Sequence, residues 1–200
     1  YRSMFEDEAR LGMMLRHPNI VRVYHARYVG ATYLMIMELV DGVSLKELLD
    51  RAMERGAPMP LAAALYVSRG LLRALSYAHR ATTPHGQPLG LVHRDVSPHN
   101  LLLGRTGDVK LADFGLADAN VHKTSLGEGM LGGKLSYLAP EVLEQQPASF
   151  KVDLFAAGIV IWEMLAGKRL FTGADDVSVG RAVLSAEGPA PFSINTRGPF

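Results

Sequence analysis

The feature that most constrains this chain is the segment His93-Arg94-Asp95-Val96-Ser97-Pro98-His99-Asn100, in which an acid and an amide stand five residues apart. A second acid, Asp113, begins the run Asp113-Phe114-Gly115, and Ala139-Pro140-Glu141 closes the series. A carboxylate can act as a general base, and carboxylate and amide oxygens are ligands that Mg²⁺ prefers. Asp and Asn are also common in turns, which is the plainer interpretation of any one of them. Three motifs in this order favour the interpretation that these residues act together in one reaction.

With these motifs the chain resembles the eukaryotic-type serine/threonine protein kinases, and more narrowly their bacterial members. The run Pro88-Leu89-Gly90-Leu91-Val92 and the variant Val96-Ser97-Pro98 resemble kinases of predatory soil bacteria. The resemblance extends from about Phe5 to Leu184. It implies ATP-dependent phosphoryl transfer to Ser or Thr hydroxyls of protein substrates in signal transduction, with ATP and Mg²⁺ as cofactors.

The fold class that this resemblance implies is α+β, with the two lobes of a protein kinase. Residues 1–40 would form a partial small lobe with one helix, two strands and the hinge. Residues 41–200 would form a mainly α-helical large lobe. No Gly-rich phosphate loop and no strand lysine precede Glu8, and the apolar pattern is lost from Gly188, so we expect a chain that is truncated at both ends.

Apolar periodicity and breaker residues predict where the elements lie. His17-Pro18-Asn19 should end the first helix, because the residue before a proline is pushed out of the helical region. Ser44 and Glu47 have the spacing of a capping box. The expected elements are helices at 4–16, 60–80 and 151–166 (the last one buried), a hairpin of strands at 21–29 and 32–38, short strands at 101–103 and 109–111, and a long mobile loop at 116–137.

The composition excludes several classes of protein. There is no cysteine among the 200 residues, which excludes disulfides and cysteine-ligated metals. A net charge of +1 provides no bulk attraction to a polyanion, so we expect no nucleic-acid partner. The most apolar run, Leu154 to Ala166, is too short to cross a bilayer and contains Glu163, so we expect no membrane segment in this chain. These features fit a cytoplasmic location, with any membrane anchor of the parent protein outside this segment.

By resemblance, Asp95 is the catalytic base that orients the substrate hydroxyl and receives its proton. Asn100 and Asp113 would hold Mg²⁺ through their oxygen atoms. His93 and Phe114 would belong to a stacked apolar spine that links the two lobes, a role that coincides with ordinary core packing.

Six residues would, by the same resemblance, contact the nucleotide or support its site. A helix glutamate would pair with an ATP-binding lysine, a gatekeeper would stand beside the adenine, and two hinge residues would bond the adenine edge through backbone atoms. An apolar residue would pack under the ring, and a serine would meet the ribose. The plainer interpretations are a solvated helix face for the glutamate and an ordinary buried strand for the hinge. In that order the residues are Glu8, Met37, Glu38, Val40, Leu102 and Ser44.

The chain departs from the family at two positions that together look like an exchange. Ser97, two residues after Asp95, stands where serine/threonine kinases usually carry a lysine that neutralises the γ-phosphate. Lys134 stands where the family usually has a threonine that faces that lysine. A cation near the transferring phosphate can come from either segment if it reaches the same point. Lys134 is therefore a catalytic candidate, and the alternative is a side chain that points to solvent.

Two further roles follow from the resemblance. Asp153 would brace the catalytic loop by accepting hydrogen bonds from its backbone, although a carboxylate at the start of a helix is also a common cap. Arg94 places a positive charge beside the base, and such an arginine commonly pairs with a phosphorylated loop residue. Thr124 and Ser125 are the expected acceptors, with a homodimer as the arrangement for autophosphorylation; otherwise they are ordinary polar loop residues.

Two other classes of function remain open. A pseudokinase or scaffold would use this fold for protein contacts, and the absence of an upstream Gly-rich loop and ATP-binding lysine would favour it. A small-molecule kinase of the aminoglycoside or choline type shares the Asp-to-Asn spacing but usually lacks the other two motifs, both of which are present here. The segment from Gly133 to Glu141 resembles the serine/threonine type more than the tyrosine type.

Overall fold

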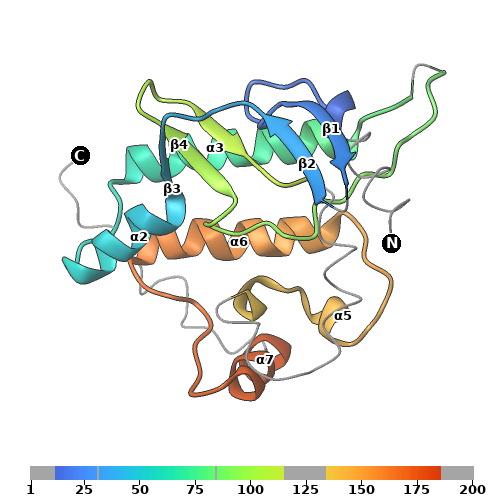
Figure 1. Ribbon diagram of the computed structural model, residues 1–200. Coiled ribbons are helices and arrows are strands. Elements are labelled where there is room, and N and C mark those ends of the chain that lie inside the picture. Colours follow the sequence, from blue (N-terminus) through green and yellow to red (C-terminus); the bar gives the residue numbers. More distant parts are fainter. Residues whose placement is uncertain (1–11, 31, 84, 115–133, 186–200) are drawn as a thin grey trace.

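The computed structural model describes residues 12–30, 32–83, 85–114 and 134–185 (Figure 1). Helices and strands are mixed, as the α+β prediction required. The elements in chain order are β1 Val23–Val29, β2 Thr32–Met37, β3 Gly42–Ser44, α2 Leu45–Glu54, α3 Leu61–His79, β4 Leu101–Gly104, β5 Val109–Leu111, the 3₁₀ helix η1 Leu135–Tyr137, α5 Pro140–Leu143, α6 Lys151–Ala166 and α7 Asp176–Ser185.

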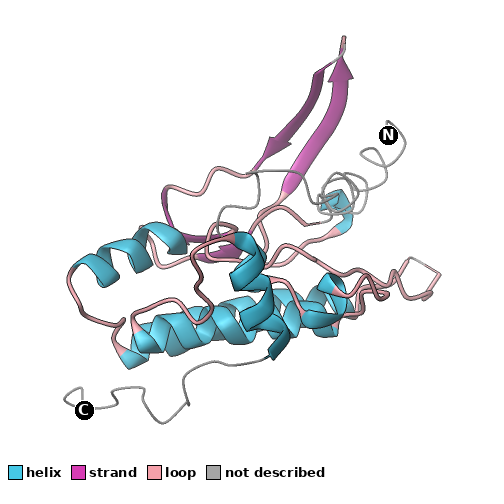
Figure 2. Cartoon of the chain, turned by 90° about the horizontal axis from the view of Figure 1, so that it is seen from below, coloured by secondary structure: helices cyan, strands magenta, loops and turns pink. Residues whose placement is uncertain are grey.

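The first strands form the predicted antiparallel hairpin, in which Val23 of β1 lies opposite Met37 of β2. Gly30 makes the turn with a φ of 62°, a left-handed conformation that glycine adopts without steric cost. Figure 2, with strands in magenta, shows the hairpin projecting away from the helices. Of the expected helix at 4–16, Gly12 to Met14 are helical, and the helix ends before His17 as predicted; residues 4–11 lie outside the described part of the chain.

Two sequence signals determine how α2 and α3 begin. Ser44 caps α2, since its Oγ accepts a hydrogen bond from the backbone N–H of Glu47 at 3.3 Å, which confirms the predicted capping pair. Such a cap is typically worth about 1 kcal/mol of helix stability. Pro60 stands just before α3 as its N-cap, so the helix begins at Leu61, one position later than predicted.

A three-stranded antiparallel sheet, in the order β3-β4-β5, lies between the hairpin and the helices. Its register places Ser44 opposite Leu102 and Leu102 opposite Lys110. The segment before the hairpin joins this sheet, because Val21 N–H donates to the Leu111 carbonyl at 2.9 Å. The two sheets are therefore connected through the edge of β5.

The core lies where α3 and α6 run side by side beneath the sheet (Figure 1). Leu71 and Leu75 of α3 and Val160 and Met164 of α6 are at most 1% exposed. Burying a side chain of this size contributes roughly 1.5–3 kcal/mol to the stability of the fold. The prediction that 151–166 forms a buried helix is confirmed.

Within the described residues no helix is long and apolar enough to span a membrane.

The prediction of a mobile loop at 116–137 is wrong at its C-terminal end. Residues 135–137 form η1, and Leu135, Ser136 and Tyr137 are all buried. The segment has too few residues for a helical period to show, so only packing against α6 and α7 orders it. Residues 115–133 of the predicted loop lie outside the described residues.

Candidate active site

A buried carboxylate at the start of α6 holds residues 93–100, the loop that the resemblance predicts to be catalytic (the catalytic loop below), in place. Asp153 Oδ2 accepts a hydrogen bond from the backbone N–H of His93, and Oδ1 accepts one from the N–H of Arg94, both at 2.8 Å. These are the contacts predicted for a brace. His79 of α3 also places Nε2 2.7 Å from Oδ2. The Asp153 side chain is fully buried, so these partners replace the water that a carboxylate would otherwise require.

His93 supports the loop from inside the core. Its Nδ1 accepts the backbone N–H of Asp95 at 3.2 Å, and its Nε2 donates to the carbonyl oxygen of Ala112 at 2.9 Å. An imidazole that accepts at one nitrogen and donates at the other is neutral. Burial lowers the pKa of His93 and favours the same neutral form. The ring also meets Phe114 edge-on with centroids 4.4 Å apart, the contact expected for the predicted spine.

Asp95 carries two polar contacts on the same carboxylate oxygen. Asn100 Nδ2 lies 3.0 Å from Asp95 Oδ2 and 2.8 Å from the Asp95 carbonyl oxygen. Lys134 Nζ lies 2.7 Å from Oδ2. The Asp95 side chain is about one quarter exposed and that of Lys134 about half exposed, so the pair stands at the surface of the site. The structure thus brings together Asp95, Asn100 and Lys134, which lie up to 39 residues apart in the chain.

A backbone hydrogen bond places Asp113 next to the loop that contains Asp95 and Asn100. Ala112 N–H donates to the Asn100 carbonyl at 2.8 Å, which positions the next residue, Asp113, beside the catalytic loop. Asp113 has a φ of 60° and Arg94 a φ of 63°, both in the left-handed region that costs a non-glycine residue free energy. Residues held in such conformations cluster at functional sites, where the surrounding structure enforces them.

The donor set suits Mg²⁺ better than a metal that needs an all-protein cage. The two hydrogen bonds of Asn100 use its amide nitrogen and leave Oδ1 available as a ligand. Within the described residues no group of three or more His, Cys, Asp or Glu could hold a metal. Mg²⁺ is usually bound through one or two carboxylates together with substrate phosphates, and Asp113 with Asn100 fits that pattern.

The predicted nucleotide residues come from the end of β2, the segment after it and the small sheet. Glu38 is fixed from two sides, because its N–H donates to the Arg22 carbonyl at 2.8 Å and its carboxylate pairs with Lys110 Nζ at 2.6 Å. Lys110 lies opposite Leu102, which in turn lies opposite Ser44. Met37, Val40, Ser44 and Leu102 are partly or largely exposed, and Glu8 lies outside the described residues.

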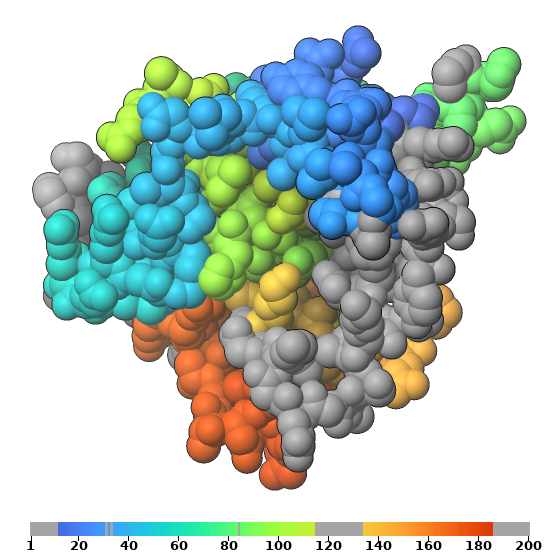
Figure 3. All heavy atoms as spheres, viewed as in Figure 1, coloured from blue at the N-terminus to red at the C-terminus, as the bar shows by residue number. Residues whose placement is uncertain are grey.

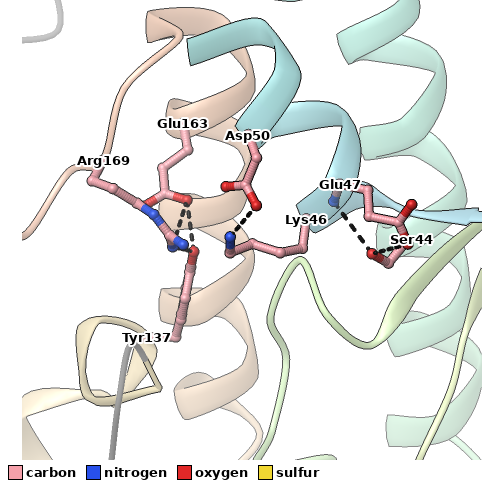
Figure 4. Close-up of polar contacts among 7 residues, drawn as sticks. All are labelled: Ser44, Lys46, Glu47, Asp50, Tyr137, Glu163 and Arg169. Carbon is pink, nitrogen blue, oxygen red and sulfur yellow. Dashed lines mark hydrogen bonds and ion pairs between the residues drawn. The ribbon is translucent and has the colours of Figure 1, made fainter. Parts of the chain in front are cut away.

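Figure 3 shows how these parts meet on one face of the molecule. The green segment that contains the catalytic loop and β4 lies between the blue hairpin, the cyan α2 and the gold segment that contains η1. Lys46, at the start of α2, donates its backbone N–H to the Pro98 carbonyl at 3.0 Å and ties that helix to the catalytic loop. Its side chain forms an ion pair with Asp50 (Figure 4).

A cluster of the buried Tyr137 and Glu163 with the partly exposed Arg169 holds η1 against α6 (Figure 4). Tyr137 OH donates to Glu163 Oε2 at 2.7 Å, Arg169 Nη1 contacts the same hydroxyl, and Leu170 N–H donates to Glu163 Oε1 at 3.3 Å. Glu163 is fully buried, and burial raises the pKa of its carboxyl, opposed by its bonds to Tyr137 and Arg169. Glu163 appeared in the sequence only as an interruption of an apolar run, so its partners could not be predicted.

Thr124 and Ser125, the expected phosphate acceptors, lie outside the described residues, so the structure does not place them against Arg94. The residues that it does bring together come from the catalytic loop, from the start of the Asp113 motif and from Lys134.

Comparison with known proteins agrees with this geometry. The chain matches the family described as "Protein kinase domain" over residues 2–190. It is 37% identical over 189 residues to the tyrosine-protein kinase MasK of Myxococcus xanthus. This alignment covers 94% of this chain and 29% of MasK. It is 38% identical over 192 residues to the serine/threonine-protein kinase PknL of Mycobacterium tuberculosis, covering 96% and 45%, and 34% identical over 186 residues to PrkC of Bacillus subtilis, also a serine/threonine-protein kinase, covering 93% and 27%.

The chain spans less than half the length of each of these relatives. The family match covers both the β1–β2 hairpin and the helical part, which confirms the predicted fold class as a partial kinase fold. With Asp95, Asn100 and Asp113 assembled as the motifs require, the chain belongs to the protein kinase domain family.

Proposed function

We propose that the protein containing this chain transfers the γ-phosphoryl group of ATP to Ser or Thr hydroxyls of protein substrates in signal transduction. The observation that carries the proposal is the assembly on Asp95, whose Oδ2 lies 3.0 Å from the Asn100 amide and 2.7 Å from the Lys134 ammonium. Two of the three relatives described above are named serine/threonine kinases, and the third is named a tyrosine kinase. The 133–141 segment supports the serine/threonine choice by its resemblance to that type.

In this proposal Asp95 accepts the hydrogen bond of the substrate hydroxyl and receives its proton as the oxygen bonds to the γ-phosphorus and the bond to ADP breaks. Asn100 Oδ1 and the Asp113 carboxylate would hold Mg²⁺. When bound, the ion would neutralise charge that develops on the phosphates. Asp153 and His93 keep the loop rigid, so that Asp95 is already oriented when the hydroxyl arrives.

Lys134 would provide the cation that Ser97 cannot. Ser97 is only 2% exposed, and its hydroxyl has no hydrogen-bond partner in the described part of the structure, so it has no access to a phosphate. The Lys134 ammonium already lies beside the proposed base, where the hydroxyl and the transferring phosphoryl group would meet. A cation at that point stabilises charge in the transition state.

The adenine would lie between the hinge and the small sheet. We propose that Met37 stands beside it, that the Glu38 carbonyl and the Val40 amide bond its edge, that Leu102 packs beneath it and that Ser44 meets the ribose. Glu8 would pair with an ATP-binding lysine, as the resemblance implies. The Lys110–Glu38 ion pair, at 2.6 Å, supports this placement by stiffening the hinge.

The test is a phosphorylation assay on a kinase domain that contains this chain and a complete small lobe. Radiolabelled ATP and Mg²⁺ are offered with matched peptides that carry a single Ser, Thr or Tyr. We expect label on the Ser and Thr peptides, and its loss in Asp95→Asn. ATP binding without transfer to any acceptor would instead favour the scaffold alternative, and label on the Tyr peptide alone would reject the Ser/Thr assignment.

A further inference from the structure

A cavity of about 720 Å³ lies apart from the candidate active site, and none of its lining residues belongs to that site. It is formed by the segment just before β1, by the second half of α3 and by the segment that follows α3. Its volume falls in the range of small-molecule sites, roughly 300–1,000 Å³. Its apolar walls include Leu15 and Leu89. The charged residues of its lining are the two arginines Arg73 and Arg80.

The polar lining consists of two arginines, three hydroxyl groups and one histidine. Arg73, Tyr77 and Arg80 are spaced four and three residues apart on α3 and at its C-cap, so they lie along one face of the helix. Arg80 donates to Ser76 through Nε and Nη2, which leaves its Nη1 available. Among the described residues Arg73 has no ion pair or hydrogen bond, and none of the described lining residues is a carboxylate.

His17 adds a third nitrogen donor to the lining. Its Nδ1 accepts the backbone N–H of Asn19 at 3.1 Å, so in the neutral ring the proton is on Nε2. The ring stacks on Tyr77 with centroids 5.0 Å apart, which fixes its orientation. Burial and then the positive charge of Arg73 lower the pKa of His17, the response expected where positive charge is not neutralised.

We propose that this cavity binds a small phosphomonoester. Guanidinium groups pair with phosphate oxygens through parallel N–H donors, of which Arg73 can supply two, and Arg80 can add its Nη1. The imidazole of His17 and the hydroxyls of Ser76 and Thr82 add neutral donors, so that several oxygens of one phosphate can be satisfied. The apolar walls receive the organic part of the ligand, since Leu15 and Leu89 line the same cavity.

The experiment is isothermal titration of the protein with phenyl phosphate at fixed ionic strength, which holds the screening of surface charges constant. We expect saturable binding to one site. Arg73→Gln and Arg80→Gln should each weaken binding several-fold, and the double variant at least about tenfold. The matched control is Arg69→Gln, an exposed arginine of the same helix that does not line the cavity, and it should leave the affinity unchanged. Thermal unfolding of each variant confirms that it is folded.

Several outcomes would overturn the proposal. One is the absence of saturable binding up to about 10 mM phenyl phosphate, a very weak affinity. Another is equal weakening by Arg69→Gln, because binding would then be general attraction to a basic helix. Inorganic phosphate that binds as tightly as phenyl phosphate would show that the walls take no organic group, and a phosphoserine peptide that binds more tightly would reject a small-molecule ligand. Because binding needs no phosphoryl transfer, this test is independent of the proposed activity.

Discussion

The ammonium of Lys134 lies 2.7 Å from Oδ2 of Asp95, although 39 residues separate them in the chain. The cation stands at the N-cap of η1, whose Tyr137 is anchored to Glu163. An ion pair with this much exposure contributes little to stability. Its importance therefore lies in its position beside the proposed base.

Replacing Lys134 by alanine in an active kinase domain should lower kcat by about 100-fold, the usual effect of removing one preorganised electrostatic donor. Adding Ser97→Lys to that variant should restore part of the rate by returning the cation to the catalytic loop. Steady-state kinetics measure both effects. Lys151→Ala, at an exposed position at the start of α6, is the control. A Lys134→Ala enzyme with nearly normal kcat would show that the lysine is only a surface partner of Asp95.

Asp153→Asn should impair both folding and catalysis. The amide keeps one acceptor oxygen but sets an N–H₂ group against donors at His93 and Arg94. We expect a loss of about 1–3 kcal/mol in the free energy of unfolding, together with reduced kcat. Urea unfolding and steady-state assays measure the two. The exposed Asp176→Asn at the start of α7 should change stability by less than about 0.5 kcal/mol, and an equal effect of both variants would contradict the bracing role.

Glu163 should make stability depend on pH. Its folded-state pKa is raised above the ordinary value of 4.5, first by burial, so the folded protein holds the proton more tightly than the unfolded chain. The stabilisation is complete below pH 4.5 and is lost as the pH rises through the folded-state pKa. The difference in unfolding free energy between the wild type and Glu163→Gln should therefore fall over that window, by at most about 1.4 kcal/mol per pH unit. A difference that is flat with pH in urea titrations would reject this assignment.

Two glycine substitutions should have opposite effects. At Gly42 an added Cβ would lie 1.9 Å from the Leu103 carbonyl oxygen, so Gly42→Ala must distort the β3–β4 pairing and should cost about 1–3 kcal/mol. At Gly158, within α6, an added Cβ meets nothing within 4 Å, so Gly158→Ala should stabilise the helix by about 0.5–1 kcal/mol. Melting temperatures that move the same way in both variants would count against the packing at one of these sites.

The double variant Thr124→Ala with Ser125→Ala should lower the activity of the full kinase domain. The reason is Arg94, the residue before Asp95, because an arginine at this position commonly pairs with a phosphorylated loop residue. Phosphorylation would neutralise its charge and order the loop. Mass spectrometry of the active enzyme should find phosphate on one of the two residues. Unchanged activity in the double variant, with no phosphate in that loop, would remove the regulatory proposal.

Local signals in the sequence were enough to predict several helices and strands. The hairpin followed from two β-rich runs separated by Gly30, and the start of α2 from the spacing of Ser44 and Glu47. Each of these rests on residues within one or two turns of chain, where steric limits and short hydrogen bonds dominate. The order of residues 135–137 was missed because it depends on packing against residues of α6 and α7 far along the chain.

The sequence by itself determined the motif residues, the family and most of the helices and strands, since these depend on residue identity and local periodicity. Only the tertiary structure decided that Lys134 meets Asp95, that His79 joins the Asp153 brace, and that Arg169 shares Tyr137 with Glu163. Partners in these contacts lie 26 to 74 residues apart along the chain. Burial in a shared core brings such groups together, and no local pattern records which ones will meet.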